Sequence, residues 1–295
     1  MANWRTRGLV GVALMIAIVW TVTPIYWTVA MSVQFESDVY VRNPSLFPLH
    51  PTDYFYLLAL GLPVPKGLVR TGISASEGIP KILSQGLRNS IIVAVVTSTI
   101  TVGVASVAAY VFARLRFRFK NGLLVTLLAS QSLPPIAVIV PYFILLGSLR
   151  LVGSITGLII VYLSLLIPLV TWVLMSFFAT LPWDVEKAAR MDGCGRLMVL
   201  RKIVMPLAAP GIFVGWVLAF LYSYNEFVYA LILTSGTPAQ TMPLAVTVLF
   251  MQETTYPTLA AVVTLSLIPV FIVALFFQKY MTQLRMVDPA AVIIR

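Results

Sequence analysis

The sequence predicts an all-helical membrane protein that crosses the bilayer six times. Of its 295 residues, 60% are hydrophobic and only 10% are charged, and the mean hydropathy is +0.97. A soluble domain is about 45–50% apolar and about 25% charged, and one globular core cannot bury such an excess of apolar residues. The composition therefore argues against a soluble enzyme, a nucleic-acid-binding module and a disordered linker.

Six apolar runs are each long enough to cross about 30 Å of hydrocarbon, which takes roughly 20 residues in a helix. Long runs without strict alternation of apolar and polar residues fit helices rather than barrel strands. The predicted transmembrane helices lie near 9–31, 89–113, 122–146, 155–179, 209–233 and 258–281.

The first run continues well past the 7–15 apolar residues of a signal peptide and has a poor cleavage site, so we expect a retained helix. The next apolar run, 54–62, is ended by Pro63 and is too short to span, so it is expected to pack at the outer surface or the interface. The outer segment that contains it, 32–88, is rich in Pro and Gly.

Two further helices carry residues that shape packing. In the second helix Ala105, Ala109 and Ala113 recur every four residues, a spacing that lets membrane helices approach closely. In the third helix Pro134 and Pro135 free backbone carbonyls and favour a kink. Such a kink would serve gating or would be an ordinary irregularity of packing.

The basic residues give the orientation. Fourteen of the 20 Lys and Arg residues fall on the side of the predicted bundle that holds both termini, and six fall on the other side. By the positive-inside rule both termini lie in the cytoplasm. The net charge of +10 then reports membrane orientation, and no nucleic-acid partner is needed to explain it.

The remaining segments are a second outer loop, 234–257, and a cytoplasmic loop, 180–208, which is much longer than a connection between helices requires. We treat the whole chain, 1–295, as one transmembrane domain without internal repeats. The single cysteine and the single histidine make a disulfide, a metal site and histidine-based catalysis unexpected. We therefore look for function in the cytoplasmic loop.

That loop has the residues of a short helix followed by a sharp turn. Asp184 is expected to cap the helix N-terminus, and Glu186 adds negative charge to the first turn. Arg190 suits the last turn, and Gly193 can take the left-handed conformation that ends a helix. A second short helix is expected over about 195–204. The pair would dock on another protein or lie as an amphipathic segment on the lipid surface.

The segment 186–193 (EKAARMDG), with Ile203 to Pro206 and Pro210 at the expected spacing, resembles the EAA loop of ATP-binding cassette (ABC) importer permeases. Lys187 stands where that family has the Glu that precedes the two alanines, and Glu186 stands one place earlier. The departure leaves open which residue makes the ion pair of that Glu. The resemblance implies an ABC type I importer permease fold and a coupling helix that contacts an ATPase through Asp184, Glu186, Lys187, Ala188, Ala189, Arg190, Asp192 and Gly193.

Other segments resemble carbohydrate permeases of the maltose-transporter second-subunit type. They are 88–118, 45–54 and the motif 224–227 (YNEF), in which Tyr224 replaces a Trp of the family. Residues 55–85 fit the resemblance least.

Glu226 is the clearest ionisable residue inside a predicted span. A carboxylate in hydrocarbon costs about 2.5–3.5 kcal/mol, so it should face the bundle interior or a wet cavity. Together with Tyr224 and Asn225 it is a candidate for the path of a polyhydroxylated solute. The alternative is a structural hydrogen bond to a neighbouring helix.

The resemblance implies a permease subunit that forms half of the pathway for a carbohydrate, such as a di- or oligosaccharide, in a prokaryotic plasma (inner) membrane. The implied partners are a second permease subunit, two ATPase subunits and an external solute-binding protein. The chain has no P-loop motif, so we expect it to be no enzyme and to hold no cofactor, while the partner ATPase binds ATP and Mg²⁺. The alternatives are an ABC permease for a non-sugar solute and an ion-gradient-driven secondary transporter or channel.

Overall fold

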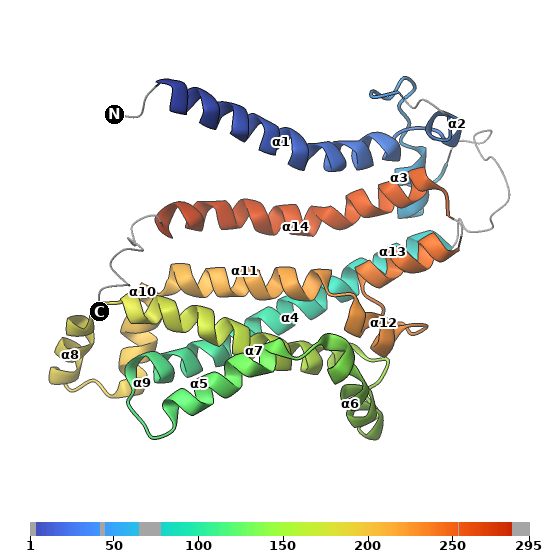
Figure 1. Cartoon of the computed structure of the whole chain (residues 1–295). Coiled ribbons are helices and arrows are strands. Elements are labelled where there is room, and N and C mark those ends of the chain that lie inside the picture. Colours follow the sequence, from blue (N-terminus) through green and yellow to red (C-terminus); the bar gives the residue numbers. More distant parts are fainter. Residues whose placement is uncertain (1–3, 42–44, 65–77, 253, 285–295) are drawn as a thin grey trace. The chain divides into compact units, whose positions relative to one another are not determined.

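The computed structural model describes residues 4–41, 45–64, 78–252 and 254–284, and within these ranges the chain is helical with no β-strand (Figure 1). The all-helical prediction is confirmed. The elements are α1 (Trp4–Ser32), α2 (Glu36–Val39), α3 (Tyr54–Leu60), α4 (Gly78–Arg114), α5 (Lys120–Ala129), the 3-10 turn η2 (Ser130–Ser132), α6 (Pro135–Ser148), α7 (Ile155–Thr180), α8 (Trp183–Met191), α9 (Arg196–Val199), the π-helical turn η3 (Leu200–Val204), α10 (Met205–Leu207), α11 (Ala209–Asn225), α12 (Val228–Thr234), α13 (Met242–Met251) and α14 (Tyr256–Leu284).

Four of the described helices are continuous and long and apolar enough to cross a membrane. They are the segments Gly8–Ser32, Gly78–Arg114, Ile155–Thr180 and Tyr256–Gln278. Two further spans result if each of two sharply bent helix pairs counts as one, which gives up to six. The prediction of continuous helices is therefore correct at four places and wrong at two.

The helix predicted over 122–146, with a kink at Pro134 and Pro135, is two separate helices, so the place of the kink is confirmed and the single helix is wrong. The segments Lys120–Ser132 and Pro135–Ser148 meet at 98°. Leu133 and Pro134 are extended, with ψ of 126° and 133°. A proline disfavours a helical conformation in the residue before it, so two consecutive prolines end one helix and begin the next. Pro135 then occupies the first turn of α6, where its missing N–H costs nothing.

The predicted continuous helix over 209–233 is also wrong. Helix α11 ends at Asn225, Glu226 is extended (φ −67°, ψ 130°), and α12 begins two residues later. At its other end, α11 is bent by 79° from the segment Arg196–Leu207. The bend lies where Ala208 leaves the helical region and Pro210 opens α11.

The two outer segments are more helical than expected. Residues 78–88 already belong to α4, whose 37 residues exceed the length that a span requires. The loop predicted over 234–257 contains α13. Asn89 Nδ2 donates to the carbonyls of Pro238 and Gln240, both at 2.8 Å, and the Met242 N–H donates to Ser90 Oγ at 2.7 Å. These bonds attach the chain before α13 to α4.

The described residues divide into two compact units, one within Met1–Ser84 and Ala245–Ile268 and the other within Gln85–Leu244 and Pro269–Arg295. In the second unit α7 supplies much of the core. Its Leu158, Val161, Tyr162, Leu166, Val170, Leu174 and Phe178 are fully buried.

Small residues allow close packing against this core. Ala105 and Ala109 of α4 are fully buried, as their spacing predicts. Gly211 of α11 lies so near Phe177 of α7 that a Cβ at this position would be 2.6 Å from the ring.

In the first unit, hydrogen bonds tie the end of α1 to the segment after it. The hydroxyls of Ser32 and Tyr56 are 2.6 Å apart, and the Thr52 N–H donates to the Val33 carbonyl at 2.8 Å. The apolar side chains of α1 from Leu9 to Trp20 are exposed, which suits a surface that faces lipid.

Candidate functional site

The predicted short helix of the cytoplasmic loop is α8. Its N-cap is Pro182, with extended dihedral angles, and not Asp184, which lies in the first turn. Asp184 and Glu186 still place negative charge at the positive end of the helix dipole. The helix ends as predicted: Gly193 has φ +85°, and the Cys194 N–H donates to the Ala189 carbonyl at 3.0 Å.

The second helix predicted over 195–204 is present as two short pieces. Helix α9 covers Arg196–Val199 and continues into the π-helical turn η3. Val199, Leu200 and Val204 are buried in the core of the second unit. The burial of these three side chains holds the cytoplasmic loop against the helical bundle.

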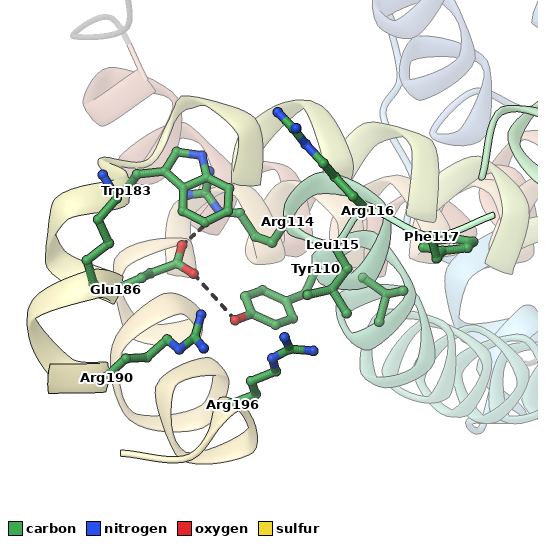
Figure 2. A pocket seen from close by; sticks show the side chains of 11 residues that line it. Tyr110, Arg114, Leu115, Arg116, Phe117, Trp183, Glu186, Arg190 and Arg196 are labelled. Atoms are coloured by element: carbon green, nitrogen blue, oxygen red, sulfur yellow. Dashed lines mark hydrogen bonds and ion pairs between the residues drawn. The ribbon is translucent and has the colours of Figure 1, made fainter. Parts of the chain in front are cut away.

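A cavity of about 600 Å³ lies between α8 and the last turn of α4 (Figure 2). Side chains from three helices line it. They include Tyr110 and Arg114 of α4, Trp183, Glu186 and Arg190 of α8, and Arg196 of α9.

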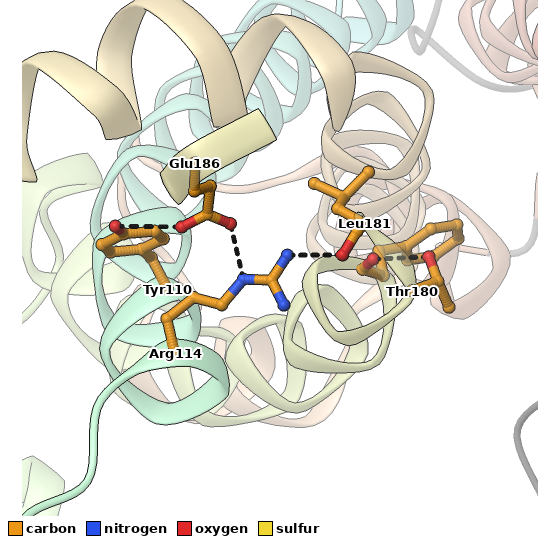
Figure 3. Close-up of polar contacts among 6 residues, drawn as sticks. Tyr110, Arg114, Thr180, Leu181 and Glu186 are labelled. Atoms are coloured by element: carbon orange, nitrogen blue, oxygen red, sulfur yellow. Dashed lines mark hydrogen bonds and ion pairs between the residues drawn. The ribbon is translucent and has the colours of Figure 1, made fainter. Parts of the chain in front are cut away.

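Glu186 and Arg114 form a buried ion pair at one wall of this cavity (Figure 3). Glu186 Oε1 lies 2.7 Å from Arg114 Nε, and the two side chains are 6% and 2% exposed. The contact is a close ion pair rather than an aligned hydrogen bond. The Tyr110 hydroxyl adds a longer bond to Glu186 Oε2 at 3.4 Å.

The same guanidinium also holds the chain that enters α8. Arg114 Nη2 donates to the carbonyl of Leu181 at 2.8 Å, and its Cζ lies 4.8 Å from the ring centre of Trp183. One side chain from the end of α4 thus contacts both the residue that leads into α8 and Glu186 in the first turn of α8. Removing either partner of such a buried pair is costly, because a buried charge then has no counterion.

Sequence reasoning missed Arg114. In the sequence Arg114 is one of the fourteen basic residues that indicate orientation, and it directly follows the predicted span 89–113. The structure also answers the question raised by Lys187. Lys187 pairs with Asp184 at 3.2 Å on the surface, with the two side chains 66% and 91% exposed, while Glu186 makes the buried pair.

The two alanines of α8 have different surroundings. Ala189 is buried against the core, and Ala188 is exposed. Asp184, Ala188 and Met191 of α8, and Asp192 directly after it, are exposed outside the cavity, whereas Lys187 and Arg190 line it. The predicted coupling residues therefore fall into an inner pair, Glu186 and Ala189, two residues that line the cavity, Lys187 and Arg190, and an exposed outer surface.

The candidate path residues 224–226 do not form one polar site. Tyr224 is 3% exposed and stacks on Phe220, with ring centres 5.8 Å apart. Asn225 is exposed, and its amide donates to the Leu221 carbonyl of its own helix at 2.8 Å.

Glu226 lies in the break between α11 and α12 and not in mid-helix. Its carboxylate accepts the Tyr162 hydroxyl at 2.7 Å and the N–H groups of Tyr229 and Ala230 at 3.0 and 3.2 Å. Such bonds satisfy free donors in the first turn of α12. Of the two alternatives for Glu226, the geometry is that of a structural hydrogen-bond acceptor.

No three His, Cys, Asp or Glu side chains gather as a metal site within the residues that the structure describes.

Comparison with known proteins gives three consistent results. Residues 101–285 match the family described as binding-protein-dependent transport system inner membrane component. The chain is 31% identical over 258 residues to the sulfoquinovosyl glycerol transport system permease protein SmoH of Agrobacterium fabrum, covering 87% of this chain and 84% of that protein. It is 34% identical over 197 residues to the trehalose/maltose transport system permease protein MalG of Thermococcus litoralis, covering 66% and 70%.

The fold is similar to a chain in the crystal structure of a bacterial ABC transporter involved in the import of the acidic polysaccharide alginate. The TM-score is 0.70 at 22% identity, over 95% of this chain and 99% of that chain.

Proposed function

The chain belongs to the family of inner-membrane components of binding-protein-dependent transport systems, and on that premise we propose that it is a permease subunit of an ATP-driven ABC importer for a carbohydrate. The relatives that support a carbohydrate are named for trehalose or maltose and for sulfoquinovosyl glycerol. The chain would form half of the translocation pathway for a di- or oligosaccharide in a prokaryotic inner membrane, with both termini in the cytoplasm.

We propose that α8 is the coupling helix and that its outer surface docks on a cytoplasmic ATPase. The exposed Ala188 gives this surface little bulk near the helix axis, the exposed Met191 offers an apolar contact, and the charged residues around them suit a polar partner. The complete importer would add a second permease subunit, two ATPase subunits that bind ATP and Mg²⁺, and an external solute-binding protein.

The observation that carries this proposal is the buried contact between Arg114 and Glu186. A helix that an ATPase is to move must be attached to a transmembrane helix, because otherwise the movement would be lost in the loop. Arg114 makes that attachment twice, to Glu186 and to the Leu181 carbonyl. When the ATPases close, α8 and the end of α4 would move as one body, as in other rigid-body switches.

Within the predicted path, we propose a solute contact for Asn225 and a supporting role for Tyr224 and Glu226. Only Asn225 of the three is exposed, whereas the Glu226 carboxylate already accepts three hydrogen bonds. An importer of sugars needs such amide groups, since they both donate to and accept from hydroxyls.

The test is affinity purification of the chain in mild detergent with identification of the co-purified subunits, followed by transport assays in proteoliposomes with labelled trehalose and maltose. We expect an ATPase and a second permease to co-purify. We also expect uptake to require ATP in the lumen of proteoliposomes in which the cytoplasmic side of the transporter faces inward. Recovery of no ATPase, or uptake that stops when an ionophore removes the ion gradient, would contradict the proposal.

A further inference from the structure

The cavity between α8 and α4 carries a strong excess of positive charge (Figure 2). Three of its arginines, Arg116, Arg190 and Arg196, here called the arginine trio, come from three different segments of the chain. In the described part of the protein none of the trio has a carboxylate oxygen within 4 Å, whereas two other pairs of charged residues do. Figure 2 shows Arg190 and Arg196 extending toward Tyr110.

The other charged residues of the cavity do not compensate the trio. The Glu186 carboxylate is paired with Arg114. Lys187 adds a further positive charge, and it pairs with Asp184 at the surface. The lining therefore contains more guanidinium groups than carboxylates, and the trio, which is exposed to solvent, attracts anions.

Guanidinium groups select the kind of anion. The planar guanidinium group can donate two parallel hydrogen bonds to two oxygens of one phosphate or carboxylate. A cavity with several guanidinium groups therefore suits an anion with several charged oxygens. A volume of about 600 Å³ is enough for a phosphate with a small polar substituent.

The remaining walls indicate where the phosphate comes from. Val111 and Leu115, at the end of α4, and Phe117, in the following segment, add apolar surface to the lining. Trp183 is 46% exposed, and tryptophan is enriched at the level of lipid headgroups. Basic pockets between helices on the cytoplasmic side of a membrane commonly receive phosphate-bearing headgroups.

We propose that this cavity binds the phosphate of an anionic phospholipid of the cytoplasmic leaflet. Arg190 and Arg196 would hold the phosphate, Arg116, which extends away from them in Figure 2, would add positive charge to the cavity, and the apolar walls would contact the glycerol and the first methylene groups. The inference rests on the membrane orientation given under the proposed function, but not on the solute or on ATP-driven transport. A bound lipid would brace α8 against α4 beside the pair of Arg114 and Glu186.

The test compares lipid retention by the whole complex. It is reconstituted in nanodiscs of phosphatidylglycerol and phosphatidylcholine, transferred to mild detergent, and examined by native mass spectrometry for bound phosphatidylglycerol. We expect the wild type to keep one such lipid per chain. The double variant Arg116→Gln, Arg196→Gln should bind this lipid about 30-fold more weakly, since each basic residue near a headgroup contributes to the binding free energy.

The matched control is the double variant Arg201→Gln, Lys202→Gln, which removes two exposed charges of the same loop outside the cavity. It should keep the lipid. Where the Gln variant does not assemble, Arg116→Lys with Arg196→Lys keeps both charges but loses the planar fork, and we expect it to lose the lipid several-fold.

Three results would overturn the proposal. One is equal loss of lipid in the cavity variant and in the control. Another is displacement of the lipid by millimolar inorganic phosphate, which would make free phosphate the ligand. The third is unchanged lipid together with loss of the ATPase from the cavity variant, which would assign the trio to a protein contact. Lipid retention is measured without any transport assay. Failure of the transport proposal would therefore not change the interpretation of the lipid result.

Discussion

The guanidinium of Arg114, in the last turn of a transmembrane helix, lies 2.7 Å from the carboxylate of Glu186 in the short helix of the cytoplasmic loop. Both side chains are almost fully buried, so neither charge is compensated by water. The pair joins the two parts of the chain that the proposed mechanism requires to move together.

Glu186→Gln should destabilise the protein strongly, because it leaves the Arg114 charge buried without a counterion. Breaking a buried pair in this way costs about 3–5 kcal/mol. The measurement is the thermal unfolding midpoint of the purified complex, together with solute-stimulated ATP hydrolysis. The neighbouring variant Lys187→Gln removes an exposed charge and should change the unfolding midpoint little.

A double replacement separates charge from packing. Arg114→Leu with Glu186→Leu should recover much of the stability lost in Glu186→Gln, since apolar side chains of similar volume often replace a buried pair at little cost. Coupling should stay impaired, because the bond to the Leu181 carbonyl is lost as well. Equal instability of Glu186→Gln and Lys187→Gln would contradict a role for the buried pair.

Gly193→Ala should destabilise the turn after α8 by about 1–2 kcal/mol and weaken coupling. Gly193 has φ +85°, a left-handed conformation that costs a residue with a Cβ about this amount. No atom lies within 4 Å of a Cβ at this position, so the effect would come from the backbone alone. Gly195→Ala is the control, because Gly195 is equally open but has φ −67°. Identical thermal midpoints for the two variants would refute the turn geometry.

Glu226→Gln and Tyr162→Phe should each lower thermal stability in the absence of solute. The first removes the negative charge of the acceptor and the second removes the donor of the same 2.7 Å hydrogen bond, and a bond to a charged group contributes about 1.5–3 kcal/mol. Their effects should not add in the double variant. Asn225→Ala should instead change the transport KM with little effect on stability. A changed solute preference in Glu226→Gln at wild-type stability would show that the carboxylate contacts solute.

Gly211→Ala should destabilise the packing of α11 on α7 by about 1–3 kcal/mol, since its Cβ would lie 2.6 Å from Phe177. The comparison is Gly147→Ala in α6, where the added methyl group meets nothing within 4 Å. There the gain in helix propensity should leave stability unchanged or slightly raised. Thermal midpoints of both variants in the same detergent provide the check.

Much of the fold follows from the sequence. Hydropathy predicts six spans, four of which are continuous helices in the structure, and the glycine after Asp192 predicts the end of α8. The two breaks were harder to find because a hydropathy window averages across them. Pro134 and Pro135 were read as a kink, while their combined effect is a bend of 98°. The overall hydropathy of the run 209–233 predicts that Glu226 lies inside one helix, and nothing local shows that its carboxylate caps the next helix.

The candidate site was predicted in part. The motif in residues 186–193 indicates a docking helix, but the motif cannot say which of its two charged residues turns inward. That depends on the direction in which the Arg114 side chain projects from α4. This direction is set by tertiary packing, and the local sequence does not indicate it. The arginine trio is likewise spread over three segments, and it becomes a cluster only when the loop folds back against α4.

Helix α4 has a consequence beyond its role as a span. Near one end Asn89 and Ser90 hold the chain that leads into α13, and at the other end Arg114 holds α8. The two attachment points are separated by about 37 Å of uninterrupted helix. Such a rod resists compression and bending far better than a loop does. A displacement of α8 would therefore be transmitted along α4 to the chain before α13 with little loss of amplitude. In this way α4 would couple movements at the two faces of the membrane.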